Sequence, residues 1–171
     1  MAKTFRIKLL PALHGDCIWI EYGDAGDTHH LLIDGGPLGA FAALRAHVEA
    51  LPAEARDVEL LVVTHIDADH IDGIVKLLRH PELGLRYREL WFNGWPQLAR
   101  SLAGGAVVQG GGGERGAISG AALDLTTMRV GLACNERFQR YAAFVPDDGE
   151  LPRARLAGGM ELTLLSPTPT K

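Results

Sequence analysis

The chain has 171 residues, of which 47% are hydrophobic and 22% are charged, and its formal net charge is −4. A chain of this length and composition folds as one domain with a buried core, so global disorder is excluded. The acidic balance excludes a strongly basic protein that coats nucleic acid, and we expect a phosphate group to bind only where bound cations reverse the local charge.

The N-terminal third predicts a strand meander followed by a helix. In residues 5–9, apolar side chains alternate with basic ones, which is typical of a half-buried strand. Residues 17–22 and 30–34 predict two more strands, separated by the turn-forming residues 23–27. Residues 40–51 contain helix-forming residues with apolar spacing and predict a helix.

The rest of the chain predicts an alternation of strands and helices, which is typical of a layered α/β fold. Residues 58–64 are the most apolar segment and predict a central strand, and we expect a helix over residues 71–78. The later expected elements are a strand over residues 88–93, a glycine-rich mobile loop over 104–116, a short helix over 117–125 and a strand over 160–165.

A cluster of metal-ligating residues follows the predicted central strand, where residues 64–73 read T-H-I-D-A-D-H-I-D-G. His65 and Asp67 are two positions apart, so at the end of a strand they can point the same way, toward one cation. Asp69 and His70, at the start of the next helix, can face a second cation beside it. Imidazole and carboxylate groups bind zinc, manganese and iron, and two such cations would polarise an ester oxygen and generate hydroxide at neutral pH.

An alternative interpretation of these residues is a solvated helix N-terminus that Asp67 and Asp69 simply cap. Capping accounts for one of the two aspartates. It does not account for two histidines that flank them directly after an apolar strand. We therefore favour the metal site.

The cluster resembles the H-x-[HD]-x-D-H signature of the metallo-β-lactamase superfamily, and the aspartate at position 67 is similar to its competence-type, ComEC-like branch. Residues 14–22 (H-G-D-C-I-W-I-E-Y) and 31–36 (L-L-I-D-G-G) resemble two further motifs of that branch, in the same order. The resemblance implies an α/β fold of the four-layer αβ/βα sandwich type, with the metals at one edge.

The resemblance also implies roles for single residues. His65 and Asp67 would hold the first metal, and Asp69 and His70 the second. Asp69 would also be the catalytic residue that orients the attacking water. The implied supporting residues are Asp34, which would brace the metal loop, and Asp16, in a loop near the site.

The sequence departs from the family pattern toward its end. Family members continue into a second αβ half that supplies a bridging aspartate and a final histidine, whereas no histidine follows His80 here. We therefore expect residues 1–171 to be a single metallo-β-lactamase-like domain, truncated at the C-terminus and with an incomplete second sheet. The sheet that a missing half leaves exposed would favour a homodimer.

The expected function is that of a metal-dependent hydrolase that cleaves a phosphodiester or related ester through a metal-bound hydroxide. One or two divalent ions, zinc or manganese, would be the cofactors, and the added negative charge of Asp67 favours manganese. The expected substrate is a small-molecule or single-stranded phosphoester. The alternatives are a catalytically incomplete metal-binding half-domain, an interaction module that needs a second chain segment, and thioester or lactam hydrolysis at the same site.

The sequence contains no predicted membrane span, signal peptide or cysteine motif, and these features bear on where the protein is located. No apolar run approaches the roughly 18 residues of a membrane span, and residues 1–10 lack the apolar region of a signal peptide. We therefore expect no membrane contact. Cys17 and Cys134 lie far apart and form no motif, so a disulfide framework is not expected and we expect a cytoplasmic protein. We interpret Cys17 as a small buried residue, because nothing near it in sequence would lower its pKa.

The remaining histidines and aromatic residues carry weaker signals. His30 and His47 are expected at the surface. Trp91, Phe92 and Trp95 are expected to pack in the core and its adjoining loop, and stacking on a substrate base is the alternative role for these rings.

Overall fold

The computed structural model describes residues 3–105, 114–147 and 149–168. Its main feature is a six-stranded sheet in the order β1-β2-β3-β4-β5, in which β6 also pairs with β4. The strands are β1 (Lys3–Leu9), β2 (Ile18–Asp24), β3 (Asp27–Ile33), β4 (Asp57–Val62), β5 (Arg86–Tyr87) and β6 (Leu90–Trp91).

The direction of the strands decides where a site can form. β1, β2 and β3 form an antiparallel meander, whereas β4 runs parallel to β3, β5 and β6. The carboxyl ends of β3, β4 and β6 therefore meet at one edge of the sheet, where parallel α/β sheets usually bind their ligands.

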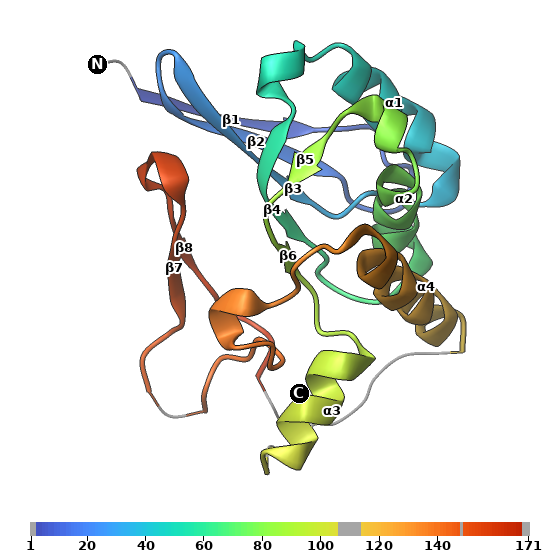
Figure 1. Ribbon diagram of the computed structural model, residues 1–171, viewed down its shortest axis with the longest axis vertical. Coiled ribbons are helices and arrows are strands. Elements are labelled where there is room, and N and C mark those ends of the chain that lie inside the picture. Colours follow the sequence, from blue (N-terminus) through green and yellow to red (C-terminus); the bar gives the residue numbers. More distant parts are fainter. Residues whose placement is uncertain (1–2, 106–113, 148, 169–171) are drawn as a thin grey trace.

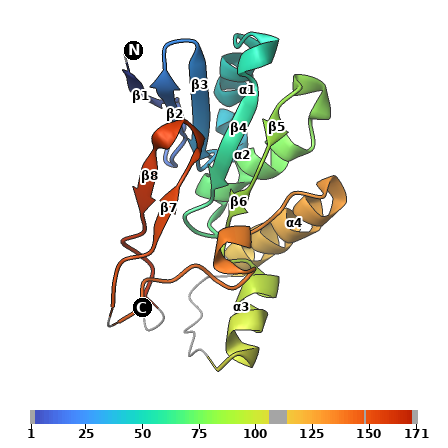
Figure 2. The ribbon, with the colours of Figure 1, turned by 60° about the vertical axis from the view of Figure 1, so that its left-hand side comes forward.

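Helices cover one face of the sheet (Figure 1). The helices are α1 (Phe41–Glu49), α2 (Ala68–Leu78), α3 (Trp95–Ala103) and α4 (Glu114–Val130). Helices α1, α2 and α4 pack on this face over a core that includes Trp19, Leu44, Leu61, Ile74 and Leu123. Figure 2 shows α3 apart from this layer, beyond the end of β6. No described helix is both long and apolar enough to cross a membrane.

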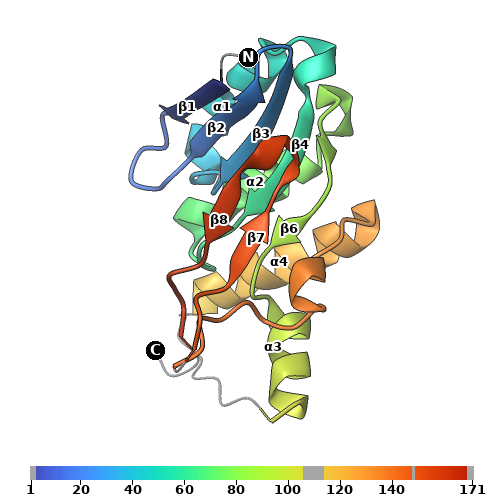
Figure 3. The same ribbon diagram turned by 90° about the vertical axis from the view of Figure 1, so that its left-hand side faces the viewer.

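A second, two-stranded sheet lies against the opposite face (Figure 3). It consists of β7 (Arg153–Arg155) and β8 (Glu161–Thr163), which are antiparallel. Ala154 and Leu156 pack there against Ile20, Leu31 and Leu60 of the main sheet. The expected α/β fold with sheets in separate layers is confirmed for the described residues. Short 3-10 helices cover residues 38–40, 53–55, 81–83, 136–138 and 157–159.

Strand β1 forms as predicted, but its burial was predicted wrongly. Phe5, Ile7 and Leu9 are 65%, 53% and 77% exposed. They lie on the same face as Ile20 and Tyr22, with which Ile7 and Phe5 pair across the strands. The two-stranded sheet covers Ile20 and Tyr22 but leaves the apolar residues of β1 in solvent.

The second half of the chain differs more from prediction. Of the strand expected over residues 88–93, only residues 90–91 form a strand, β6, and the separate β5 precedes the expected range. The helix expected over 117–125 is the longer α4. Helix α3 and strand β7 were not predicted. Of the loop expected over 104–116, residues 106–113 lie outside the described residues, and residues 114–116 belong to α4.

Candidate metal centre

The loops after β3 and β4 are joined to helix α2 by backbone hydrogen bonds. Asp34 follows β3 directly, and its backbone N–H donates to the carbonyl of Val62 at 2.8 Å. The N–H of Gly35 donates to the carbonyl of His70 at 2.8 Å. The N–H of Gly73 donates to Gly36 at 2.9 Å. These bonds fix α2 beside the end of β3 and bring His70 to the sheet edge.

The carboxylate of Asp34 is buried, with the residue 1% exposed, and it accepts three hydrogen bonds. Its Oδ2 accepts from the Thr64 hydroxyl at 2.6 Å and lies 2.8 Å from Nδ1 of His70. Its Oδ1 accepts from the backbone N–H of Thr64 at 2.8 Å. An ionised carboxylate only accepts hydrogen bonds, so it places the proton of the His70 ring on Nδ1. Asp34 thus has the bracing geometry that the resemblance implied.

The bond to Asp34 leaves Nε2 of His70 as the ring nitrogen with a free lone pair. Nε2 lies 3.6 Å from Oδ2 of Asp69, a side chain that is 29% exposed. Two ligands at about 2.1 Å from a tetrahedral ion lie about 3.4 Å apart. Asp69 and His70 are therefore spaced as two ligands of one cation, and their donor types suit zinc or manganese.

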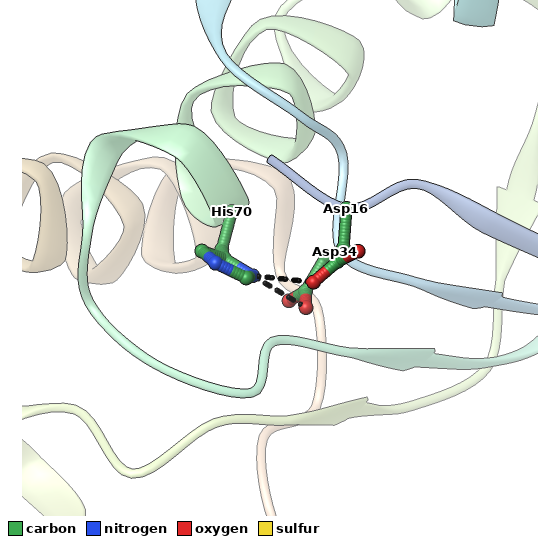
Figure 4. Close-up of side chains that lie close together, drawn as sticks. All are labelled: Asp16, Asp34 and His70. Carbon is green, nitrogen blue, oxygen red and sulfur yellow. Dashed lines mark hydrogen bonds and ion pairs between the residues drawn. The ribbon is translucent and has the colours of Figure 1, made fainter. Parts of the chain in front are cut away.

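Asp16, in the loop between β1 and β2, approaches the same ring. Its Oδ2 lies 3.9 Å from Nδ1 of His70, and its side chain is 63% exposed. One ligand atom each of Asp16, Asp34 and His70 lies within 4.8 Å of the other two. Figure 4 shows both carboxylates directed toward the His70 ring. Because hydrogen bonds already occupy Asp34, Asp16 is the carboxylate of this trio that is open to solvent.

Gly15 permits this approach. A Cβ atom at Gly15 would lie 1.9 Å from the carbonyl oxygen of Asp69. A side chain at this position would separate the two loops, so the short loop before β2 requires glycine here.

His65 and Asp67 are exposed on the loop that leads from β4 to α2. The ring of His65 contacts that of His70, with centroids 4.0 Å apart. Asp67 is the N-cap residue of α2, and its backbone carbonyl accepts from the N–H of His70 at 3.0 Å. Its side chain makes no capping hydrogen bond. Capping by a carboxylate therefore does not explain Asp67.

The predicted site residues all lie at one edge of the sheet, but their ligand atoms do not all lie close enough together to bind the same cation. The described group of mutually close ligand atoms joins His70 to Asp16 and Asp34, which were expected to have supporting roles. His65, Asp67 and Asp69 line the adjoining loop and helix start, and the ligand set of His65, Asp67, Asp69 and His70 stays a prediction.

Sequence reasoning missed Thr64. Its hydroxyl and its N–H both donate to Asp34, so it joins the loops after β3 and β4. Its position could have indicated this role, because Thr64 comes soon after β4 and Asp34 comes directly after the neighbouring strand β3.

Cys17 is confirmed as a packing residue. It is 4% exposed, and burial, together with the charge of Asp34, raises the pKa of its thiol to about 12. A thiol protonated at neutral pH is a poor nucleophile. His30 and His47 were wrongly expected at the surface, since His30 is 3% exposed and His47 is half-buried with its Nε2 atom covered.

Comparison with known proteins adds one finding. The family profile described as the metallo-beta-lactamase superfamily matches residues 10–171. The match includes the loops after β1, β3 and β4, which carry the candidate ligands. None of the curated proteins compared with the chain matches it.

Proposed function

Since the chain belongs to the metallo-beta-lactamase superfamily, we propose that it is a metal-dependent hydrolase whose substrate is a phosphodiester or a related ester. The superfamily consists mostly of hydrolytic enzymes and typically binds divalent metals. The observation that carries the proposal is the orientation of His70. Its Nδ1 is held by buried Asp34, and its Nε2 lies beside the Asp69 carboxylate, at the edge where β3, β4 and β6 end.

In the proposed site, His65 and Asp67 hold one cation, and Asp69 and His70 hold a second. When bound, such cations polarise the ester and make a water molecule more acidic. The carboxylate of Asp69 orients the attacking water and accepts a hydrogen bond from it. Asp34 keeps the proton on Nδ1 of His70 and thereby presents Nε2 in a fixed direction.

The aspartate at position 67 supports the proposal that the site prefers manganese. It also supports the proposal that the chain belongs to the competence-type, ComEC-like branch. A carboxylate is a harder ligand than imidazole and adds negative charge. An anionic ester at this edge also meets Asp16 and Asp69, so its binding depends on the cations. Activity restricted to the zinc-loaded protein would contradict the manganese preference.

The test is hydrolysis of bis(4-nitrophenyl) phosphate by the manganese-loaded protein. Asp69→Asn is expected to lower kcat by at least about 100-fold, because the neutral amide cannot take a proton from the water and is a weaker ligand for the cation. The matched control is Asp27→Asn, the same exchange in a side chain that is 79% exposed at the opposite end of β3. Equal kcat values for the two variants would contradict the proposed role of Asp69.

A metal-binding module without hydrolytic activity is the second candidate. It is favoured by the confinement of all seven histidines to residues 14–80, so every imidazole ligand comes from the first half of the chain. In that case the protein would retain metal and hydrolyse neither phosphodiesters nor thioesters.

A further inference from the structure

Trp95 differs from the other tryptophans of the chain. Trp19 and Trp91 are 0% and 7% exposed and belong to the two cores, whereas Trp95 is 71% exposed. One exposed apolar side chain is ordinary by itself. Whether the exposed ring has a binding role therefore depends on how its backbone is held and on how close it lies to the candidate metal centre.

The backbone of Trp95 is firmly held at the start of α3. Its N–H donates to Oδ2 of Asp124 at 3.2 Å. The preceding Gly94 is the N-cap residue, and a Cβ atom there would lie 2.2 Å from Oδ1 of Asp124. Pro96 follows in the first turn, where its fixed φ suits a helix start. The result is a rigid backbone that carries an exposed indole ring.

Helix α4 links Trp95 to the candidate metal centre. Near its start, an added Cβ at Gly116 would lie 3.2 Å from Oδ1 of Asp67. Two turns later, Asp124 accepts from the N–H of Trp95. Eight residues of helix span about 12 Å. Strand β6, which leads to Trp95, also runs parallel to β4, which leads to Asp67 (Figure 3).

The described side chains between these points do not favour binding by positive charge. Asp67 and Asp124 lie at the two ends of this part of α4, and Arg100 of α3 lies over the ring of Tyr141, with 4.9 Å to the centroid. A neutral aromatic face can bind a flat ring without a cationic side chain, and every nucleobase offers such a face.

We propose that Trp95 stacks on a base of the substrate, which makes the substrate class a base-bearing, single-stranded phosphodiester. The inference rests on the proposed hydrolase function and adds a specificity-determining residue to it. The metal centre would act on the phosphodiester while Trp95 holds a nearby base.

The competing explanation is a protein contact. Leu102 is 46% exposed and follows Trp95 by seven residues, which places both on one side of α3. A second copy of the chain or another protein that docked on this row would contact both residues, whereas a base near the metal centre would contact Trp95 alone.

The test compares the binding of two fluorescein-labelled oligomers of equal length to the metal-loaded protein by anisotropy. One is oligothymidylate, and the other is its abasic counterpart, which has the same phosphodiesters without bases. Trp95→Ala is expected to weaken oligothymidylate binding by roughly 5- to 150-fold, the range for loss of one stacked base. Abasic binding stays unchanged, Trp95→Phe retains most of the affinity, and the matched control Leu102→Ala binds both oligomers normally.

Three results would overturn the inference: no binding of oligothymidylate, equal weakening of both oligomers by Trp95→Ala, or unchanged oligothymidylate affinity in that variant. A change of oligomeric state in sedimentation for both Trp95→Ala and Leu102→Ala would assign the row to a protein contact instead. Binding needs no turnover, so failure of the proposed hydrolase appears separately, in the bis(4-nitrophenyl) phosphate assay.

Discussion

Asp34 has both a buried carboxylate and an unusual backbone conformation. Its φ is 55°, in the left-handed region that aspartate and asparagine tolerate better than most residues. This turn ends β3 and directs the side chain toward Thr64 and His70. A single residue therefore fixes the backbone, the loop after β4 and the orientation of a candidate ligand.

Asp34→Asn keeps the size and the backbone preference but replaces one acceptor oxygen with an N–H donor. At the position of Oδ1 that donor would face the backbone N–H of Thr64, and at the position of Oδ2 it would face the Thr64 hydroxyl and Nδ1–H of His70. We expect the free energy of unfolding to fall by about 1–3 kcal/mol in urea denaturation. Metal affinity is expected to fall by about 10- to 100-fold in a competitive titration. Unchanged metal affinity would show that Asp34 does not orient His70.

The pattern of residues 64–73, directly after the predicted central strand, indicated His70 as a ligand, whereas Asp16 and Asp34 were implied by the family resemblance. The structure places one ligand atom each of Asp16, Asp34 and His70 within 4.8 Å of the other two, and the roles of these residues stay predictions. The short distance between Asp69 and Nε2 of His70, and the role of Thr64, depend on how three loops pack together, which no local pattern specifies.

At the scale of whole elements, close contacts between backbones set the position of α2. A Cβ atom at Gly73, in the second turn of the helix, would lie 1.9 Å from the carbonyl oxygen of Gly35. Helix α2 can therefore approach the end of β3 only with glycine at this position, and this approach brings His70 to Asp34.

Two glycines in helix interiors give a matched comparison. Gly73→Ala is expected to destabilise the protein by several kcal/mol, since it overpacks backbone against backbone. Gly120→Ala, in α4, adds a methyl group at ordinary contact distances of 3.5 Å or more and is expected to be neutral or to stabilise by up to about 1 kcal/mol. Thermal denaturation of both variants measures the difference. Equal loss of stability would contradict this account of helix placement.

The elements predicted correctly have long apolar patterns, such as β4 and α2. Strand β7 has three residues and owes its formation to packing against the main sheet, so its sequence carries little signal. Alternation in β1 correctly predicted a strand. It could not predict burial, because a two-residue period shows that the faces differ and not whether another layer covers the apolar one.

At the scale of the whole molecule, the two faces of the main sheet are unequally covered. Helices pack over one face, and two short strands cover part of the other. The homodimer, the cytoplasmic location and the domain assignment stay predictions. The fold also buries His30 and half-buries His47, away from the metal centre, and these histidines link its stability to pH.

His30 and His47 both contact the ring of Trp19, with ring centroids 5.1 and 4.9 Å from it. Burial lowers the pKa of His30, partly offset by the carbonyl of Asp57. Burial, together with the charge of Lys8, lowers the pKa of His47. The unfolded chain keeps the ordinary pKa of about 6.5 and so takes up protons first as the pH falls. The stability that the neutral rings of His30 and His47 contribute is fully present above about pH 6.5. It is lost as the pH falls from about 6.5 through their lowered pKa values in the folded protein.

His47→Leu tests this dependence, because Nε2 of His47 is buried without a hydrogen-bond partner in the described structure. The variant is expected to be at least as stable as the unsubstituted protein at pH 7.5 and to lose less stability by pH 5.5. Urea denaturation at both pH values measures this. An identical pH dependence in the two proteins would show that His47 does not contribute.

The metal content of the protein tests most directly whether His65, Asp67, Asp69 and His70 form a metal centre. The protein is loaded with manganese or zinc, dialysed and analysed by mass spectrometry of the metals, alongside Asp69→Ala and the exposed control Asp27→Ala. We expect one or two cations to remain bound per chain in the unsubstituted protein and in the control, and we expect cations to be lost from Asp69→Ala. Retention of the same metal content by Asp69→Ala, or no retained metal in any of the three proteins, would contradict a metal centre at this edge of the sheet.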